Sequence, residues 1–173
     1  MKTKGDLRVQ PRGEREIVIT RSFDAPRGLV FEAMTRPELL KRWLGVFGGW
    51  SLAVCEVDLR VGGAYRYLWH GPDGATMGMR GTFREIAPPE RIVNTEKFDE
   101  AWYPGEAVGT AILTERDGRT TVTTTVLYES REIRDAALGS GMERGIAAGY
   151  LALDDILASQ TLASQTGGEG RTS

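Results

Sequence analysis

The fold is decided by residues 64–86, which read AYRYLWHGPDGATMGMRGTFREI. Large apolar side chains recur at every second position on both sides of residues 71–74, and Gly-Pro-Asp-Gly is typical of a tight turn. A period of two indicates a half-buried β-strand, because successive side chains point to opposite faces of a sheet. The stretch therefore predicts two antiparallel strands joined by a turn.

The same period continues along most of the chain, and further strands are expected at residues 16–23, 50–59, 91–98, 107–115 and 120–128. Asp117-Gly118 between two apolar runs is a strong hairpin signal, so the strands are expected to follow one another as an antiparallel meander. Helical spacing replaces this period in two places. It predicts two short helices between Pro26 and Trp43, and one long amphipathic helix after Ser130.

These elements predict a single α+β domain over residues 14–158, with about seven strands and a long C-terminal helix. Residues 1–13 and 159–173 are expected to be flexible tails. Glycines recur every four residues on the long helix, at Gly141, Gly145 and Gly149, although each costs roughly 1 kcal/mol relative to alanine. We therefore expect that face of the helix to pack closely on its neighbours or to border empty volume.

Composition excludes several classes of function. Lysine and arginine total 22 and aspartate and glutamate 24, so a net charge of −2 predicts neither nucleic acid nor an anionic membrane as a partner. One cysteine, Cys55, and one histidine, His70, cannot build a disulfide framework, a cysteine-based zinc site or a His-rich metal centre. No secretory or membrane-spanning segment is recognised, so a cytoplasmic location is expected.

Several short segments have a familiar order. They read RSFDAP (21–26), VFEA (30–33), TRPELLKRW (35–43), CEVDLRVGG (55–63), MGMRG (77–81), EIAPPERI (85–92) and SGMERG (140–145). Together they resemble the activator-of-heat-shock-ATPase-like branch of the START-related (SRPBCC) superfamily over residues 15–158. The resemblance implies the helix-grip fold, in which a curved antiparallel sheet surrounds the terminal helix and leaves a cavity between them. It implies no single chemistry, because the superfamily spans lipid carriers, hormone receptors, polyketide cyclases and sequestering resistance proteins.

Alternation along the strands gives candidates for the wall of that cavity. Aromatic side chains share one face of the strand at residues 64–70, and methionines share one face of the strand that follows. Such side chains form adaptable apolar sites, but they are equally consistent with a filled core. With the apolar stripe of the long helix, the candidate ligand-binding residues are Tyr65, Tyr67, Trp69, Met77, Met79, Met142, Ile146 and Tyr150.

Two polar residues add a more specific signal. Asn94 and Glu96 share the parity of Ile92 and Phe98, so they point inward if the apolar side chains do. Burial disfavours the charged form of a carboxyl group, which predicts a raised pKa for Glu96 and a role in orienting a ligand or moving a proton. In the alternative interpretation this face is outward and Glu96 is solvated.

Two tryptophans complete the candidate site. Trp43 lies in the second short helix, and Trp102 lies in the loop that follows Phe98. Each could cap the cavity or contact a partner, because large aromatic side chains are seldom left exposed without a reason. Packing against the end of the long helix is an equally good interpretation.

Three functions remain open. The first is binding of a small apolar or aromatic ligand with one or two polar groups, by a monomer or homodimer that needs no metal or cofactor. The second is a cavity enzyme of cyclase or hydrolase type with Glu96 as general base. The third is a stress-linked or chaperone-linked interaction module whose own side chains fill the cavity. A void between sheet and helix favours the first two.

Overall fold

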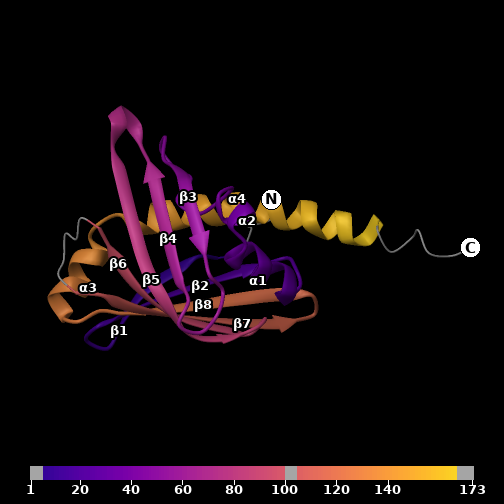
Figure 1. Cartoon of the computed structure of the whole chain (residues 1–173). Coiled ribbons are helices and arrows are strands. Elements are labelled where there is room, and N and C mark those ends of the chain that lie inside the picture. The colour runs from indigo at the N-terminus through magenta and orange to yellow at the C-terminus, as the bar shows by residue number, and fades with distance from the viewer. Residues whose placement is uncertain (1–5, 100–104, 167–173) are drawn as a thin grey trace, which may run out of the picture.

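The computed structural model describes residues 6–99 and 105–166, which form an eight-stranded antiparallel sheet with helices on its concave side (Figure 1). The strand order is β1-β2-β8-β7-β6-β5-β4-β3. The strands are β1 (Arg8–Arg12), β2 (Glu16–Phe23), β3 (Ser51–Val57), β4 (Ala64–His70), β5 (Thr76–Ala87), β6 (Arg91–Phe98), β7 (Ala107–Arg116) and β8 (Arg119–Leu127). The helices are α1 (Arg27–Thr35), α2 (Pro37–Leu40), α3 (Arg131–Leu138) and α4 (Met142–Thr166), with a 3-10 turn at Pro72–Gly74.

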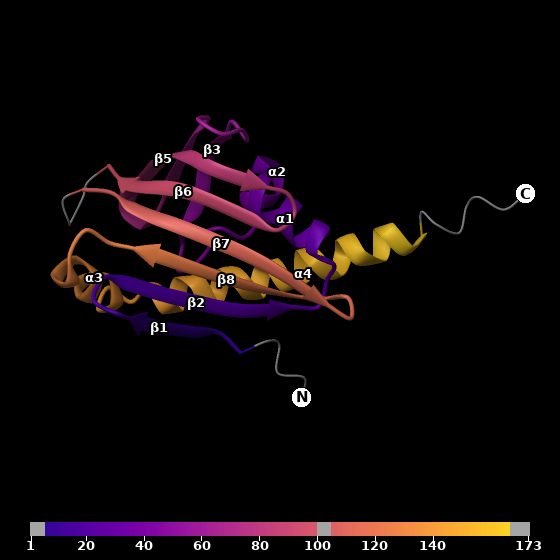
Figure 2. The ribbon, with the colours of Figure 1, turned by 90° about the horizontal axis from the view of Figure 1, so that it is seen from below.

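The sheet curls around α4. Strands β1, β2, β8 and β7 pass beneath the helix, whereas β4 and β5 rise beside it (Figures 1 and 2). Two bulges support this curvature: the register shifts between Leu52 and Val54 in β3, and between Phe83 and Glu85 in β5. A bulge bends its strand and increases the local twist. The curvature gives the sheet a concave face toward α1, α2 and α4.

Helix α4 is held on the sheet by a buried apolar face. Leu153 and Leu157 are fully buried, and Tyr150 packs edge-on against Phe23 of β2, with the ring centres 5.1 Å apart. Such aromatic pairs contribute about 0.5–1.5 kcal/mol beyond the area they bury. The middle of α4 is therefore the part that fixes the helix on the sheet.

A buried ion pair adds a polar attachment between the same two elements. The guanidinium of Arg21 in β2 donates to both carboxylate oxygens of Asp154 in α4, at 2.6 and 2.5 Å, and the two side chains are only 4% and 11% exposed. The guanidinium also donates to the carbonyl of Ser22 and lies 4.7 Å from the Phe23 ring centre. A buried charge needs this full set of partners, so the pair restricts how α4 can sit on the sheet.

The α+β fold expected from the sequence is confirmed, with one strand more than expected. The additional strand, β1, lies inside residues 1–13, which the sequence analysis treats as a tail. It pairs with β2 along its whole length, from Arg8 opposite Thr20 to Arg12 opposite Glu16. The sequence gives no strand signal for β1, because this segment is mostly polar and contains Pro11. Sheets tolerate proline at an edge strand.

The C-terminal helical region also differs in detail. Ser130 caps α3 as the sequence suggests, its hydroxyl accepting the backbone N–H of Ile133 at 3.2 Å. The region is divided into α3 and α4, because Gly141 takes a φ of 82°, which ends regular helix. Helix α4 then continues to Thr166, through the first part of the expected tail 159–173. Alanine, leucine and glutamine in that part favour helix.

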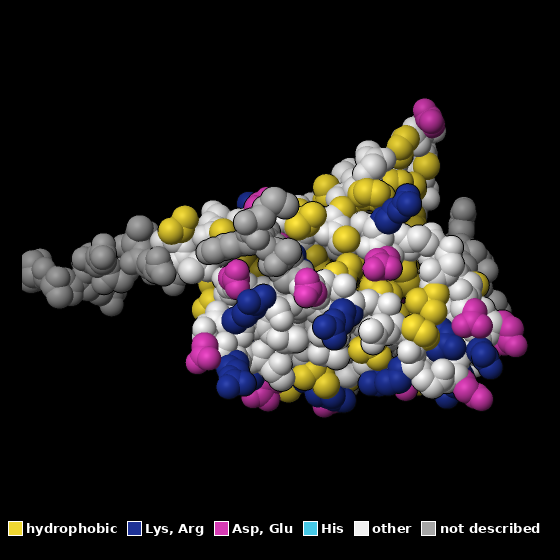
Figure 3. Space-filling view, turned by 180° about the vertical axis from the view of Figure 1, so that it is seen from behind, with side chains coloured by type: hydrophobic (Ala, Val, Ile, Leu, Met, Phe, Trp, Pro, Cys, Tyr) yellow, Lys and Arg dark blue, Asp and Glu magenta, His cyan; other side chains and the backbone are white. Residues whose placement is uncertain are grey.

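The surface seen from behind carries acidic and basic side chains interspersed over the body of the protein (Figure 3). Apolar side chains gather there on the projecting end of the sheet, where β4 and β5 meet. None of the helices within residues 6–99 and 105–166 has the length and apolar character needed to span a bilayer.

Candidate functional site

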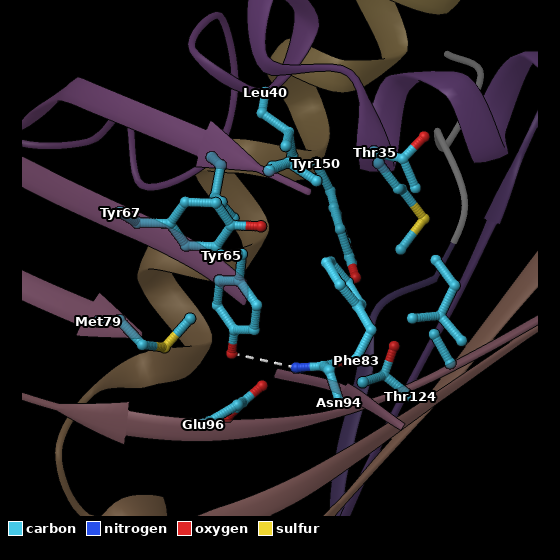
Figure 4. A pocket seen from close by; sticks show the side chains of 15 residues that line it. Thr35, Leu40, Tyr65, Tyr67, Met79, Phe83, Asn94, Glu96, Thr124 and Tyr150 are labelled. Carbon is cyan, nitrogen blue, oxygen red and sulfur yellow. Dashed lines mark hydrogen bonds between the residues drawn. The ribbon is translucent and has the colours of Figure 1, made fainter. Parts of the chain in front are cut away.

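A cavity of about 200 Å³ lies between the concave face of the sheet and the helices (Figure 4). Helices α1, α2 and α4 and six consecutive strands, β3 to β8, contribute to its wall. The lining residues are Met34, Thr35, Leu40, Leu44, Val57, Tyr65, Tyr67, Met79, Phe83, Ile92, Asn94, Glu96, Ala111, Thr124 and Tyr150. Most are apolar or aromatic, and the carboxyl group of Glu96 is the one acidic group in this described lining.

Aromatic rings from β4 and β5 form one wall. Tyr65 and Tyr67 point to the same side of the sheet, with ring centres 4.9 Å apart, and Phe83 lies 5.4 Å from Tyr65. Met79 lies beside them (Figure 4). Burial raises the pKa of Tyr67 well above its usual value, with smaller contributions from Cys55 and Glu96, so its hydroxyl stays neutral. This aromatic wall is thus uncharged, and the Tyr67 hydroxyl can donate or accept a hydrogen bond.

The polar end of the cavity is built from β6. The side-chain amide of Asn94 donates to the Tyr65 hydroxyl at 3.1 Å and to the carbonyl oxygen of Thr95 at 3.3 Å. The Tyr65 hydroxyl donates in turn to the same carbonyl. The amide nitrogen must face this carbonyl, which can only accept, so the amide oxygen of Asn94 is left toward the cavity.

Glu96 is the second polar residue of this end. Its side chain has some accessible surface because it borders the cavity, but the surrounding protein removes most of its hydration, and this raises its pKa to about 7. The raised pKa agrees with the direction expected from the sequence. No residue among those described forms a hydrogen bond or ion pair with this carboxyl group. Arg80 and Lys97, the nearest cations along the neighbouring positions, are exposed on the convex face.

Small residues on β7 provide the empty volume. The concave-side positions of this strand are Ala107, Gly109 and Ala111, each buried. A Cβ atom added to Gly109 would lie 3.2 Å from Oε1 of Glu96 and 3.5 Å from Oδ1 of Asn94. The side chains of Glu96 and Asn94 therefore lie close against the Gly109 backbone, in the space that a larger side chain at this position would take.

Tyr150 brings α4 into the cavity wall. Its hydroxyl hydrogen-bonds with Thr124 of β8, and its ring lies 5.8 Å from that of Trp43. Burial raises the pKa of Tyr150 to about 12, although the Thr124 bond and the charge of Arg21 act in the opposite direction. The Tyr150 side chain is therefore neutral, with its hydroxyl bonded to Thr124 and its ring packed against Trp43.

The structure brings half of the expected site residues together. Those that line the cavity are Tyr65, Tyr67, Met79, Asn94, Glu96 and Tyr150. Trp43 and Trp69 are buried beside it and do not line it; their indole N–H groups donate at 2.9 Å to the carbonyls of Ala33 and Leu44. The Trp43 bond thus links the residues after α2 to α1, and the Trp69 bond attaches this segment to β4.

The other expected residues lie elsewhere. Met77 is 41% exposed and borders a separate hollow of about 270 Å³ near Trp50 and Phe98, because it lies too far along the projecting hairpin to reach the cavity. Met142 and Ile146 of α4 are partly buried against the core and are not part of the described cavity wall. Trp102 lies outside the described residues.

Several lining residues were missed by the sequence analysis. Phe83 has the parity of Met79, and Ile92 has the parity of Asn94 and Glu96, so the alternation could have included them. The others come from α1, α2, β3, β7 and β8, which reach the cavity only through the curvature of the sheet. The signal for β7 is its row of small residues at alternate positions, 107, 109 and 111.

Within residues 6–99 and 105–166, no group of three or more His, Cys, Asp or Glu side chains is arranged to hold a metal ion. Cys55 is buried, and its pKa is raised by burial, so its thiol is held in the neutral form. The chemistry that the described site offers is therefore that of Glu96, Asn94 and the tyrosine hydroxyls.

The sequence model of the Activator of Hsp90 ATPase homolog 1-like proteins matches residues 24–158. The chain belongs to this family. The match covers the elements from the end of β2 to the last buried turn of α4, and hence the whole cavity wall. No match was found among the curated proteins.

Solved structures support the family assignment. A protein from Rhodobacter sphaeroides is 32% identical, with a TM-score of 0.83 over 88% of this chain and 98% of that one. A protein from Arthrobacter aurescens is 27% identical, with a TM-score of 0.77 over 88% of this chain and 91% of that one. An Hsp90 activator from Plasmodium falciparum is 25% identical, with a TM-score of 0.50 over 65% of this chain and 72% of that one. The chain thus shares its fold with proteins of several organisms, and one of these similar proteins is named as an Hsp90 activator.

Proposed function

We propose that this protein binds a small apolar or aromatic molecule, with one or two polar groups, in the cavity between the sheet and α4. The observation that carries the proposal is the cavity itself, whose aromatic and aliphatic wall ends at Asn94 and Glu96. Ligand sites are commonly apolar pockets in which a few polar groups fix the orientation of the ligand. Asn94 is held by Tyr65 and Thr95, so its amide oxygen is already oriented.

The volume limits the size of the ligand. A cavity of about 150 Å³ is sufficient for benzene, whereas drug-sized ligands occupy pockets of about 300–1,000 Å³. At about 200 Å³, this cavity is suited to one ring with a short substituent.

A cavity-filling variant tests the proposal. Ala111 is 8% exposed and faces the cavity, whereas its neighbour Ile112 is 39% exposed on the opposite face of β7. We expect 2-phenylethanol to cause saturable NMR shifts in the amides of β5 and β6, and Ala111→Phe to abolish them. Ile112→Phe, the matched control, should keep them.

Two results would contradict cavity binding. One is the absence of saturable shifts with toluene, phenol, 2-phenylethanol and 2-phenylethylamine alike. The other is an unchanged titration in Ala111→Phe. Overpacking costs about 1–3 kcal/mol, so Ala111→Leu serves as a milder variant where Ala111→Phe loses its dispersed NMR spectrum.

A second function is favoured by one observation. The pKa of Glu96 is about 7, and a general base acts best when its pKa lies near the working pH. A cavity enzyme of cyclase or hydrolase type would then use Glu96 to remove a proton from the bound molecule. Such an enzyme would lose turnover in Glu96→Gln but retain substrate binding, which single-turnover kinetics and equilibrium titration distinguish.

A chaperone-linked role is the third candidate. It is supported by the likeness to the Plasmodium falciparum Hsp90 activator, whereas a cavity of about 200 Å³ does not agree with a core filled by its own side chains. Calorimetric titration of this protein with purified Hsp90 measures that interaction directly. Absence of heat at micromolar concentrations would remove this candidate.

A further inference from the structure

The polar end of the cavity presents acceptors, and its amide donor is already used. The Asn94 amide nitrogen donates to Tyr65 and Thr95, and the Thr35 hydroxyl donates to the carbonyl of Phe31 at 2.8 Å. The Glu96 carboxyl oxygens and the Asn94 amide oxygen have no donor among the described residues. A ligand that brings N–H or O–H groups of its own would satisfy them.

These acceptors converge on one place. Asn94 lies opposite Gly109 in the β6–β7 register, and a Cβ on Gly109 would be 3.2 Å from Glu96 Oε1 and 3.5 Å from Asn94 Oδ1. The two oxygens thus lie near one point beside the Gly109 backbone, and a single donor group on their cavity side can approach both. Figure 4 shows both side chains pointing into the space that the aromatic wall faces.

The carboxyl group of Glu96 also lacks a positively charged partner in the described cavity wall. Among the described lining residues there is no lysine, arginine or histidine, so the Glu96 carboxylate has no counter-charge from the protein wall. A buried carboxylate without a cation is costly, and it either takes up a proton or pairs with a cation from outside. The neighbouring rings of Tyr65, Tyr67 and Phe83 favour a cation as well, because the face of an aromatic ring is negative.

We propose that the ligand is a primary amine on a body of about one ring, with its ammonium group on the cavity side of the Glu96 carboxyl group and the Asn94 amide oxygen. This inference rests on the proposed binding function and adds the chemical class of the ligand. An ammonium group has three donors and no acceptor, which complements two carboxylate oxygens and an amide oxygen. It also supplies the charge that the cavity wall lacks.

Three probes of similar size test this inference: 2-phenylethylamine, 2-phenylethanol and phenylacetate, which are cationic, neutral and anionic at about pH 8. Isothermal titration of the full chain should show the amine binding at least about tenfold more tightly than the alcohol, and phenylacetate more weakly than either. In Glu96→Gln the amine should lose about tenfold in affinity, while the alcohol changes by less than about twofold. Gly109→Ala should weaken the amine, because the added Cβ would lie 3.2 Å from Glu96 Oε1 and would displace the carboxyl group.

Gly145→Ala provides the matched control, because a Cβ at Gly145 meets no atom within 4 Å. The Gly145→Ala variant should bind all three probes with the same affinity as the unmodified chain. An alcohol that binds as tightly as the amine would overturn the inference and leave cavity binding intact. An amine that binds Glu96→Gln unchanged would overturn it too, because the ammonium would then sit elsewhere. Failure of all three probes would count against the binding function itself.

Discussion

At the scale of the single residue, Glu96 links stability to pH. Its pKa is about 7 in the folded protein, against 4.5 for a solvated glutamate, because burial disfavours the charged form. Between these values the folded protein binds more protons than the unfolded chain, so the free energy of unfolding falls as the pH rises. The contribution is fully present below about pH 4.5 and is lost above about pH 7. A shift of this size corresponds to roughly 3 kcal/mol.

Glu96→Gln should therefore remove this pH dependence. The variant keeps the shape of the side chain but carries no charge, so its stability relative to the unmodified protein should increase by roughly 3 kcal/mol between pH 4.5 and pH 8. Urea unfolding at several pH values measures the difference. Glu56→Gln, at an exposed position of β3, controls for the loss of one negative charge. Parallel profiles for Glu96→Gln and the unmodified chain would show that Glu96 is hydrated.

At the scale of the element, the glycines of α4 have different surroundings. A Cβ on Gly149 would lie 2.9 Å from the carbonyl oxygen of Trp43, so the helix packs there against the backbone that follows α2. At Gly145 a Cβ would meet nothing within 4 Å. The close packing expected from the spacing of these glycines is found at Gly149, and open space is found at Gly145. One helix therefore contains a glycine that packing requires and another that it does not.

Alanine substitutions at these two positions should have opposite effects. Gly149→Ala should destabilise the protein by about 1–3 kcal/mol, because the Trp43 backbone cannot move away as a flexible side chain can. Gly145→Ala should stabilise it by up to about 1 kcal/mol through helix propensity. Urea unfolding midpoints with unchanged slopes provide the comparison. Stabilisation by both variants would mean that α4 does not touch Trp43 at Gly149.

The alternation of residues predicts which side chains share a face of a strand, so the meander and the shared face of Tyr65 and Tyr67 could be predicted. Whether the face of Glu96 points inward stayed open in the sequence. The alternation does not give the depth along the strand. Trp69 and Met77 lie on the expected faces of their strands but do not reach the cavity. The Trp69 indole donates to the carbonyl of Leu44, and Met77 lies on the projecting hairpin. Strand β1 was not predicted because its mostly polar residues give no apolar alternation. It is held by backbone pairing with β2.

In the protein as a whole, helix α4 extends past the buried core. The last buried residues of α4 are Ile156 and Leu157, at 4% and 2% exposure, and the helix continues beyond the sheet toward Thr166 (Figure 1). The exposed part includes Leu162, at 63%. This extension adds little to the core, although it is regular helix.

Removal of residues 159–173 should therefore leave the stability nearly unchanged. We expect the melting temperature to change by less than about 3 °C, the shift that about 1 kcal/mol produces in a chain of this size. Removal of residues 156–173 also deletes Ile156 and Leu157, and should lower the melting temperature much further. Differential scanning calorimetry compares the two truncations. Equal losses would show that the extension contributes to packing.

The pairing of β2 with β8 has a consequence for how the protein is made. Glu16 lies opposite Leu127, so β2, near the start of the sequence, pairs with β8, the last strand of the meander. Strands β3 to β7 can pair with their sequence neighbours as they are synthesised, but the hairpin of β1 and β2 has no place to attach until β8 has left the ribosome. Long-range pairing of this kind is slow, typically milliseconds to seconds. Residues 8–23 are thus among the first to be synthesised and among the last to reach their final positions, and until then the apolar side chains of β2 remain exposed.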